Sequence, residues 1–187
     1  RTLCRFDLQQ TTGWMISDPD RAASILAAYE AASAGDYTFF SYFPAQRVGF
    51  AAMATAMDLA SGISAERADR IARERETALL GDALNAPMPH LAGSVDGLTL
   101  PESFRQPTTS DRPVLIVSGT LDGRTYPEAA AEVASALPNS TTVTVENAGH
   151  NLFFDHPDVV GLIVDFASGA AVPTQTLVAP HPTLSDR

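Results

Sequence analysis

One stretch in the second half of the sequence constrains the fold more than any other. Residues 113–119 form a short apolar, β-branched run ending in glycine, which is typical of a strand buried on both faces of a parallel sheet. A helix pattern follows from Pro127, a second strand pattern covers 141–145, and a last helix pattern begins at Pro157. The order strand, helix, strand, helix predicts a right-handed parallel crossover unit and therefore an α/β fold class.

Two strands alone would leave a sheet edge with unpaired backbone groups and apolar surface. We therefore expect the end of a larger sheet, whose first strands are not in this sequence.

The first half of the sequence is predicted to be helical. Asp18 and Pro19 together are a helix start, with Asp at the N-cap and Pro at the first helical position, and this helix is expected to reach Ser33. Further helical stretches are expected over 49–60 and, with Ser64 as N-cap, over 64–80. An irregular linker rich in Pro, Gly and Asn is predicted to follow.

Composition excludes several classes of function. The net charge of −10 argues against a nucleic-acid surface, because no basic stripe can neutralise phosphates. No apolar run approaches the roughly 20 residues of a membrane helix. Every basic residue is Arg, so no Lys can form a Schiff base. The one cysteine, Cys4, is expected to be inert, no metal or cofactor is predicted, and the localisation is left open.

Two loops carry the candidate catalytic residues. Asp122 lies in the loop 118–125 directly after the first predicted strand, and His150 lies in the loop 146–151 directly after the second. Reactive groups in open parallel sheets sit beyond the carboxyl ends of the strands. We therefore expect Asp122 to accept the imidazole N–H of His150, as the acid and the base of a catalytic triad do.

These segments resemble those of a known superfamily. Residues 112–125 resemble the acid-bearing strand and turn of α/β-hydrolases, and residues 147–150 look like their histidine loop. The sequences of these two segments are most similar to those of the proline-iminopeptidase and tricorn-interacting aminopeptidase branch. The resemblance implies a helical cap and linker over 1–105, the C-terminal strands and helices of the hydrolase core over 106–170, and an extended tail over 171–187.

One element of the superfamily pattern, the serine elbow, is missing from this sequence. Members of this superfamily carry a Gly-x-Ser-x-Gly elbow before the acid and the base, and no such pattern occurs here. The serines of the sequence lack this context, Ser61, Ser94 and Ser118 included. The chain is therefore expected to begin downstream of the nucleophile and to supply only Asp122 and His150.

Other polar and aromatic residues are given structural roles. Glu146 is expected to be solvated, His156 to cap the last helix, and His90 and His181 to lie at the surface. Arg124 could orient a substrate carboxylate, although an ion pair is the favoured interpretation. The aromatic cluster at 37–43 could line a substrate pocket, although core packing is favoured.

The sequence thus predicts the C-terminal portion of a serine hydrolase, most consistent with a peptidase releasing N-terminal residues. Its partner would be an N-terminal hydrolase polypeptide with the serine, or a homo-oligomer that covers the open sheet edge. The substrate would be a peptide or a small ester. Two alternatives stay open: an inactive, truncated chain acting as a binding or structural module, and an esterase of the same superfamily.

Overall fold

The computed structural model describes residues 2–46 and 52–181, and the chain divides into two compact units. Residues 1–14 and 28–106 make up the helical unit, and residues 15–27 and 107–187 make up the sheet unit. The division falls at the end of α1 and within α2, so a short N-terminal segment belongs with the C-terminal part of the chain. None of the helices in the described residues is long and apolar enough to span a membrane.

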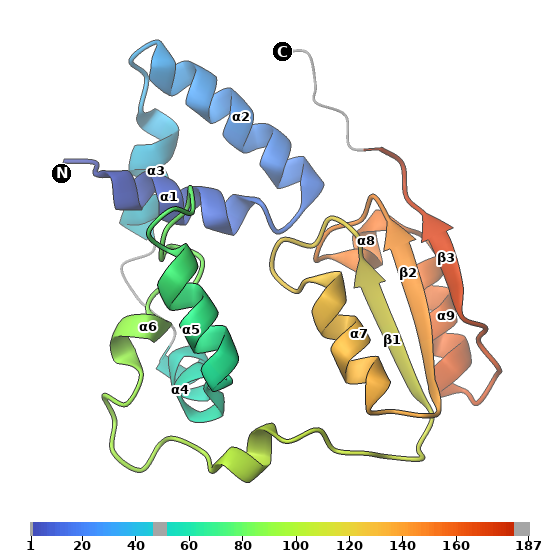
Figure 1. Ribbon diagram of the computed structural model, residues 1–187. Helices are drawn as coiled ribbons and strands as arrows, with labels where there is room; N and C mark the ends of the chain where they lie inside the picture. The colour runs from blue at the N-terminus through green and yellow to red at the C-terminus, as the bar shows by residue number, and fades with distance from the viewer. Residues whose placement is uncertain (1, 47–51, 182–187) are drawn as a thin grey trace. The chain divides into compact units, whose positions relative to one another are not determined.

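Helices and turns make up most of the described residues up to 105 (Figure 1). The predicted starts agree with the structure: α2 begins at Pro19, and the Ser64 hydroxyl accepts the Arg67 N–H, 3.3 Å away, at the start of α5. The predicted stretch 49–60 corresponds to α4, although 49–51 lie outside the described residues. In order, the elements are α1 (Arg5–Met15), α2 (Pro19–Ser33), α3 (Thr38–Gln46), α4 (Ala52–Ser61), α5 (Ala65–Glu74), α6 (Met88–Leu91) and the 3₁₀ turn η1 (Glu102–Arg105).

The aromatic cluster folds as a helix, α3, which the sequence patterns did not indicate. Aromatic residues are only moderate helix formers, but burial of Phe40 compensates for this. Its ring centre lies 5.0 Å from that of Tyr29 and 5.7 Å from that of Phe39. The Asp36 carboxylate, two residues before the helix, accepts the N–H of Thr38, the first helical residue, at 2.9 Å. Side-chain and backbone hydrogen bonds from Thr38 hold the pKa of Asp36 below its usual value.

The described residues of the sheet unit form three parallel strands in the order β1-β2-β3 (Figure 1). In the register, Val117 pairs with Val143 and Leu177 pairs with Val145. The strands and helices predicted from 113 onward are present with ends shifted by a few residues. In order, the elements of the sheet unit are β1 (Val114–Gly119), α7 (Pro127–Ser135), β2 (Ser140–Glu146), α8 (Leu152–Asp155), α9 (Asp158–Ala167) and β3 (Gln175–Val178), and of these the short helix α8 and the strand β3 were not predicted.

Strand β3 differs from the sequence prediction, in which 171–187 is an extended tail. Residues 175–178 instead pair with β2, and the Ala179 N–H donates to the Glu146 carbonyl, 3.0 Å away. Four residues are too few to show a clear alternation, and Pro173 and Pro180 flank them and suggest irregular chain. The residues beyond 181 lie outside the described part.

The core of the sheet unit lies between the strands and α9, which Figure 1 shows behind β2 and β3. Val145, Ala148, Val159 and Ala179 are buried together. Partly buried apolar side chains complete this cluster: Val117, Leu152, Ile163 and Leu177. Because Ala148 belongs to the core, the loop that carries His150 is anchored two residues before the histidine.

Two neighbouring valines of α9 test this core. Val159 is 1% exposed and Val160 is 47% exposed. Val159→Ala should lower the free energy of unfolding of the sheet unit by about 1.5–3 kcal/mol, because buried methyl groups are lost and a cavity remains. Amide exchange of Val143 and Val145 measures the change. Val160→Ala is the matched control and should change it by less than about 0.5 kcal/mol; equal effects would contradict the assigned core.

Candidate active site

Two loops meet at the carboxyl ends of β1 and β2, and each carries one of the predicted residues. The acid loop comprises residues 118–125 and the histidine loop residues 146–151. The Leu121 N–H donates to the Ala148 carbonyl at 2.9 Å, and the Asn147 N–H donates to the Thr120 hydroxyl at 3.0 Å. The loops are therefore bonded to each other through their backbones as well as through their side chains.

Gly119 allows this close contact. A Cβ atom at Gly119 would lie 2.4 Å from the Ala148 carbonyl oxygen and 2.6 Å from that of Gly149. Real Cβ atoms do not approach backbone so closely, so any larger residue would push the loops apart. Asn147 adds a second constraint, since its φ of 63° is a left-handed conformation that Asn tolerates.

Asp122 is buried, and its two carboxylate oxygens have separate partners. Oδ1 accepts the backbone N–H groups of Arg124 and Thr125, each at 2.8 Å. Oδ2 lies 3.0 Å from Nδ1 of His150. The two amides fix the rotation of the carboxylate, so that its second oxygen faces the imidazole.

His150 is held from its backbone and its ring. Its N–H donates to the Ser17 carbonyl at 2.9 Å, and its ring is bonded through Nδ1 to Asp122. Its side chain is 35% exposed, whereas that of Asp122 is 7% exposed. With the proton on Nδ1, the other ring nitrogen, Nε2, keeps its lone pair and can accept a proton from a hydroxyl group.

A second carboxylate, Asp18, holds the residue that follows His150. The Asn151 N–H donates to Asp18 Oδ1 at 2.9 Å, and its side-chain amide donates to Oδ2 at 2.7 Å. Sequence patterns identify Asp18 only as a helix N-cap. The contact joins residues 133 positions apart, so no local pattern could have indicated it.

A third carboxylate, Asp155, accepts the Gly149 N–H at 2.7 Å. Partial burial raises the pKa of Asp155, the hydrogen bond from Gly149 opposes this effect, and the charges of Asp18 and Asp20 raise the pKa further. The histidine loop is thus bonded to carboxylates on both sides of His150.

Residues 98–176 match the family model described as TAP-like protein, which is a model of α/β-hydrolases. This segment belongs to the TAP-like branch of the α/β-hydrolase superfamily. Searches of curated proteins and of solved structures gave no match. The TAP-like segment contains both loops, and the match indicates a hydrolase-like function for it.

Outside the Asp122–His150 pair, the predicted residues have structural or surface positions. His156 Nδ1 accepts the Asp158 N–H, 3.2 Å away, at the first residue of α9, but the N-cap position of that helix is Pro157, so His156 lies one residue before the cap that was expected of it. The Arg124 side chain is exposed, and it is the Arg124 backbone that contacts Asp122. Surface positions are found for the rest: Cys4, His90, Glu146 and His181.

In the described part of the chain, neither a metal site nor a serine elbow accompanies the pair. Within 2–46 and 52–181, no three His, Cys, Asp or Glu side chains are placed to hold a metal ion. Ser61 ends α4, Ser94 lies in a turn and Ser118 lies within β1. None of them stands at a turn between a strand and a helix.

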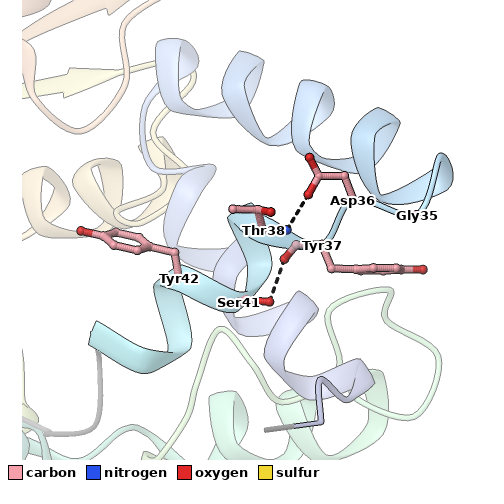
Figure 2. A pocket seen from close by; sticks show the side chains of 6 residues that line it. All are labelled: Gly35, Asp36, Tyr37, Thr38, Ser41 and Tyr42. Atoms are coloured by element: carbon pink, nitrogen blue, oxygen red, sulfur yellow. Dashed lines mark hydrogen bonds between the residues drawn. The ribbon is translucent and has the colours of Figure 1, made fainter.

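The helical unit has a depression of its own at the start of α3 (Figure 2). Tyr37 and Tyr42 line it and are exposed, and Figure 2 shows their rings pointing away from each other. Phe40 is buried instead. The core packing favoured from the sequence is therefore found for Phe40, whereas Tyr37 and Tyr42 lie at the surface.

Glycine substitutions test the contact between the loops of the TAP-like segment. Gly119→Ala should destabilise the sheet unit and separate Asp122 from His150, because the added carbon has only backbone atoms to displace. A crystal structure or imidazole NMR of the variant checks the separation. Gly161→Ala in α9 is the control. A Cβ at this position would meet nothing within 4 Å, so the free energy of unfolding should rise by about 0.5–1 kcal/mol. Unchanged loops in Gly119→Ala would contradict the prediction.

The raised pKa of Asp155 predicts a pH-dependent effect on stability. Below pH 3.8 the carboxyl is protonated in both the folded and the unfolded chain. As the pH rises, the unfolded chain releases the proton first, so this group lowers the free energy of unfolding until the folded carboxyl has also ionised.

Asp155→Asn should therefore be more stable than the natural chain near neutral pH and no more stable in acid, while its amide oxygen still accepts the Gly149 N–H. Thermal unfolding across pH measures the difference. The exposed Asp111→Asn serves as control, with little expected change at any pH; a gain for Asp155→Asn that persists in acid would refute this account.

Proposed function

We propose that this chain supplies the acid and the base of a serine hydrolase, with Asp122 as the acid and His150 as the base. One observation carries the proposal: Asp122 Oδ2 lies 3.0 Å from His150 Nδ1. The other oxygen of the same carboxylate, Oδ1, accepts two backbone N–H groups, which fix its orientation. A catalytic carboxylate needs this arrangement to fix the tautomer of its histidine. The family match, which spans both residues, supports the same reaction class.

In the proposed reaction, a serine hydroxyl attacks the carbonyl carbon of the substrate while Nε2 of His150 takes its proton. His150 then donates that proton to the leaving group, so that an acyl-enzyme forms, and water releases the acyl group by the same route in reverse. Asp122 keeps the imidazole in orientation and stabilises its charged form. No metal or cofactor is needed for these steps.

The serine is proposed to come from a segment outside this sequence, carried by the same or a separate polypeptide. Strand β1 supports this proposal. It forms one edge of the described sheet, and its residues 114–117 are apolar and only partly buried. Edge strands of stable proteins usually carry charges or are covered. A further parallel strand along β1 would cover this edge and bring its own loop to the side of the sheet where Asp122 and His150 lie.

A peptidase that releases N-terminal residues is the proposed substrate class, with the helical unit as its cap. The support is the resemblance of the two loops to the aminopeptidase branch and the TAP-like description of the matching family. Such a peptidase requires a group that binds the free α-amine of its peptide substrate. An esterase would use the same triad, and substrate profiling with aminoacyl amides and simple esters separates the two.

Fluorophosphonate labelling, read by intact mass under denaturing conditions, tests the proposal. We expect a label on a serine outside residues 1–187, carried by a polypeptide that copurifies with them. A preparation that contains only this chain and takes up no label would instead support a binding or structural module.

Substitutions in the labelled, active material test the two residues. Asp122→Asn should lower kcat by roughly 10⁴, because the amide favours the wrong tautomer of the histidine. His150→Ala should abolish labelling. The exposed Asp111→Asn makes the same chemical change and should leave turnover unaltered. Near-normal turnover in Asp122→Asn would remove Asp122 from the triad.

A further inference from the structure

A short segment that is far from the acid loop and the histidine loop in sequence packs against both of them. We give the name brace segment to residues 16–19, which are the three residues between α1 and α2 together with Pro19, the first residue of α2. All of them belong to the sheet unit. The Ser17 carbonyl accepts a hydrogen bond from the His150 N–H. The Asp18 carboxylate accepts hydrogen bonds from the backbone N–H and from the side-chain amide of Asn151. The backbone on either side of the His150 side chain is thereby bonded to the brace segment.

The brace segment also fits closely against a glycine in each loop. A Cβ at Gly123 would lie 2.5 Å from the Ile16 carbonyl oxygen, and a Cβ at Gly149 would lie 2.6 Å from Cδ of Pro19. Gly123 follows Asp122 and Gly149 precedes His150. One segment therefore contacts the chain next to the acid and next to the base.

Asp18 is the charged centre of this contact. The residue is only 7% exposed, and the Arg21 guanidinium lies 3.7 Å away at the surface of α2. Burial of a carboxylate is costly unless hydrogen bonds offset it, and here the bonds come from Asn151 and from the Ser17 hydroxyl. A helix N-cap needs neither burial nor a partner in the histidine loop, so capping α2 does not account for this arrangement.

We propose that Asp18 is a positioning residue for His150. Through Asn151 and the Ser17 carbonyl it fixes the backbone of the histidine loop, so that the ring meets Asp122 with its proton on Nδ1. The catalytic meaning of this role rests on the function proposed above. The positioning itself does not, because it concerns the hydrogen bond between two residues of this chain.

Asp18→Ser is the variant that separates positioning from helix capping. Serine is as good an N-cap as aspartate, but its side chain is too short to reach Asn151. In long-range ¹H–¹⁵N spectra of the folded chain, the ratio of the Nδ1–H to the Nε2–H tautomer of His150 should fall by roughly fivefold or more, the change expected for the loss of one hydrogen bond. His150→Gln identifies the signals among those of the four histidines.

Two further variants serve as controls. Asp20→Ser makes the same change in the first turn of α2, at an exposed carboxylate, and should leave the His150 tautomers unaltered. Asp18→Asn keeps an oxygen for the Asn151 N–H, and the Asn151 amide can turn to accept its NH₂ group, so this conservative variant should restore the natural ratio without the charge. A purely structural role would lower the melting temperature of Asp18→Ser and leave the ratio unchanged, which would overturn the proposal.

If Asp18→Ser does not fold, Asn151→Ala removes the side-chain bond from the other partner, and an unchanged tautomer ratio in that folded variant would also overturn the proposal. In active material, Asp18→Ser should lower kcat by roughly tenfold or more, with little change in KM. A shifted ratio in a chain that never acquires hydrolase activity would support positioning and refute the proposed function. Full turnover in Asp18→Ser would refute positioning and leave the hydrolase assignment intact.

Discussion

The site depends on one close backbone contact, between Gly119 at the end of β1 and the Ala148–Gly149 peptide at the end of β2. A side chain at Gly119 would meet the Ala148 carbonyl at 2.4 Å, so the absence of a Cβ sets the distance between the acid loop and the histidine loop. Ala148 is itself buried in the core with Val145 and Val159. The packing of α9 on the sheet is therefore transmitted to His150 through two residues of backbone, and the position of the histidine depends on the apolar core as well as on its own hydrogen bonds.

The predictions from sequence were most successful where a local pattern and its structural cause coincide. The β-branched run that forms β1, the Pro at the start of α2 and the Ser64 cap of α5 each depend on neighbouring residues, and each is found where it was expected. The juxtaposition of Asp122 and His150 followed from strand order alone, since parallel strands end at the same edge of a sheet. Their catalytic role is a separate matter and stays a prediction.

The elements that sequence could not supply depend on distant partners. Strand β3 has four residues between prolines, and it is a strand because β2 offers an edge. Helix α3 is aromatic and gains its stability from burial of Phe40. The local pattern around Asp18 correctly predicted where α2 begins, but the carboxylate of Asp18 bonds to Asn151, 133 residues later. A residue can thus match a local motif while the chemistry of its side chain is determined elsewhere.

The bonds that join Asp122 to His150 all lie within the sheet unit. Backbone amides of the acid loop hold Asp122, the core anchors the histidine loop, and the brace segment is hydrogen-bonded to the histidine loop and lies close to Gly123 of the acid loop. Under the proposed function, a strand added along β1 would not have to create the acid–base pair and would only have to place a hydroxyl group near Nε2 of His150. This arrangement requires the Asp122–His150 pair to be rigid before the added strand binds. Each hydrogen bond that formed only on binding would cost conformational entropy and so weaken the association of that strand. Asp18, buried at some energetic cost against the histidine loop, is the residue whose contacts are best explained by that requirement.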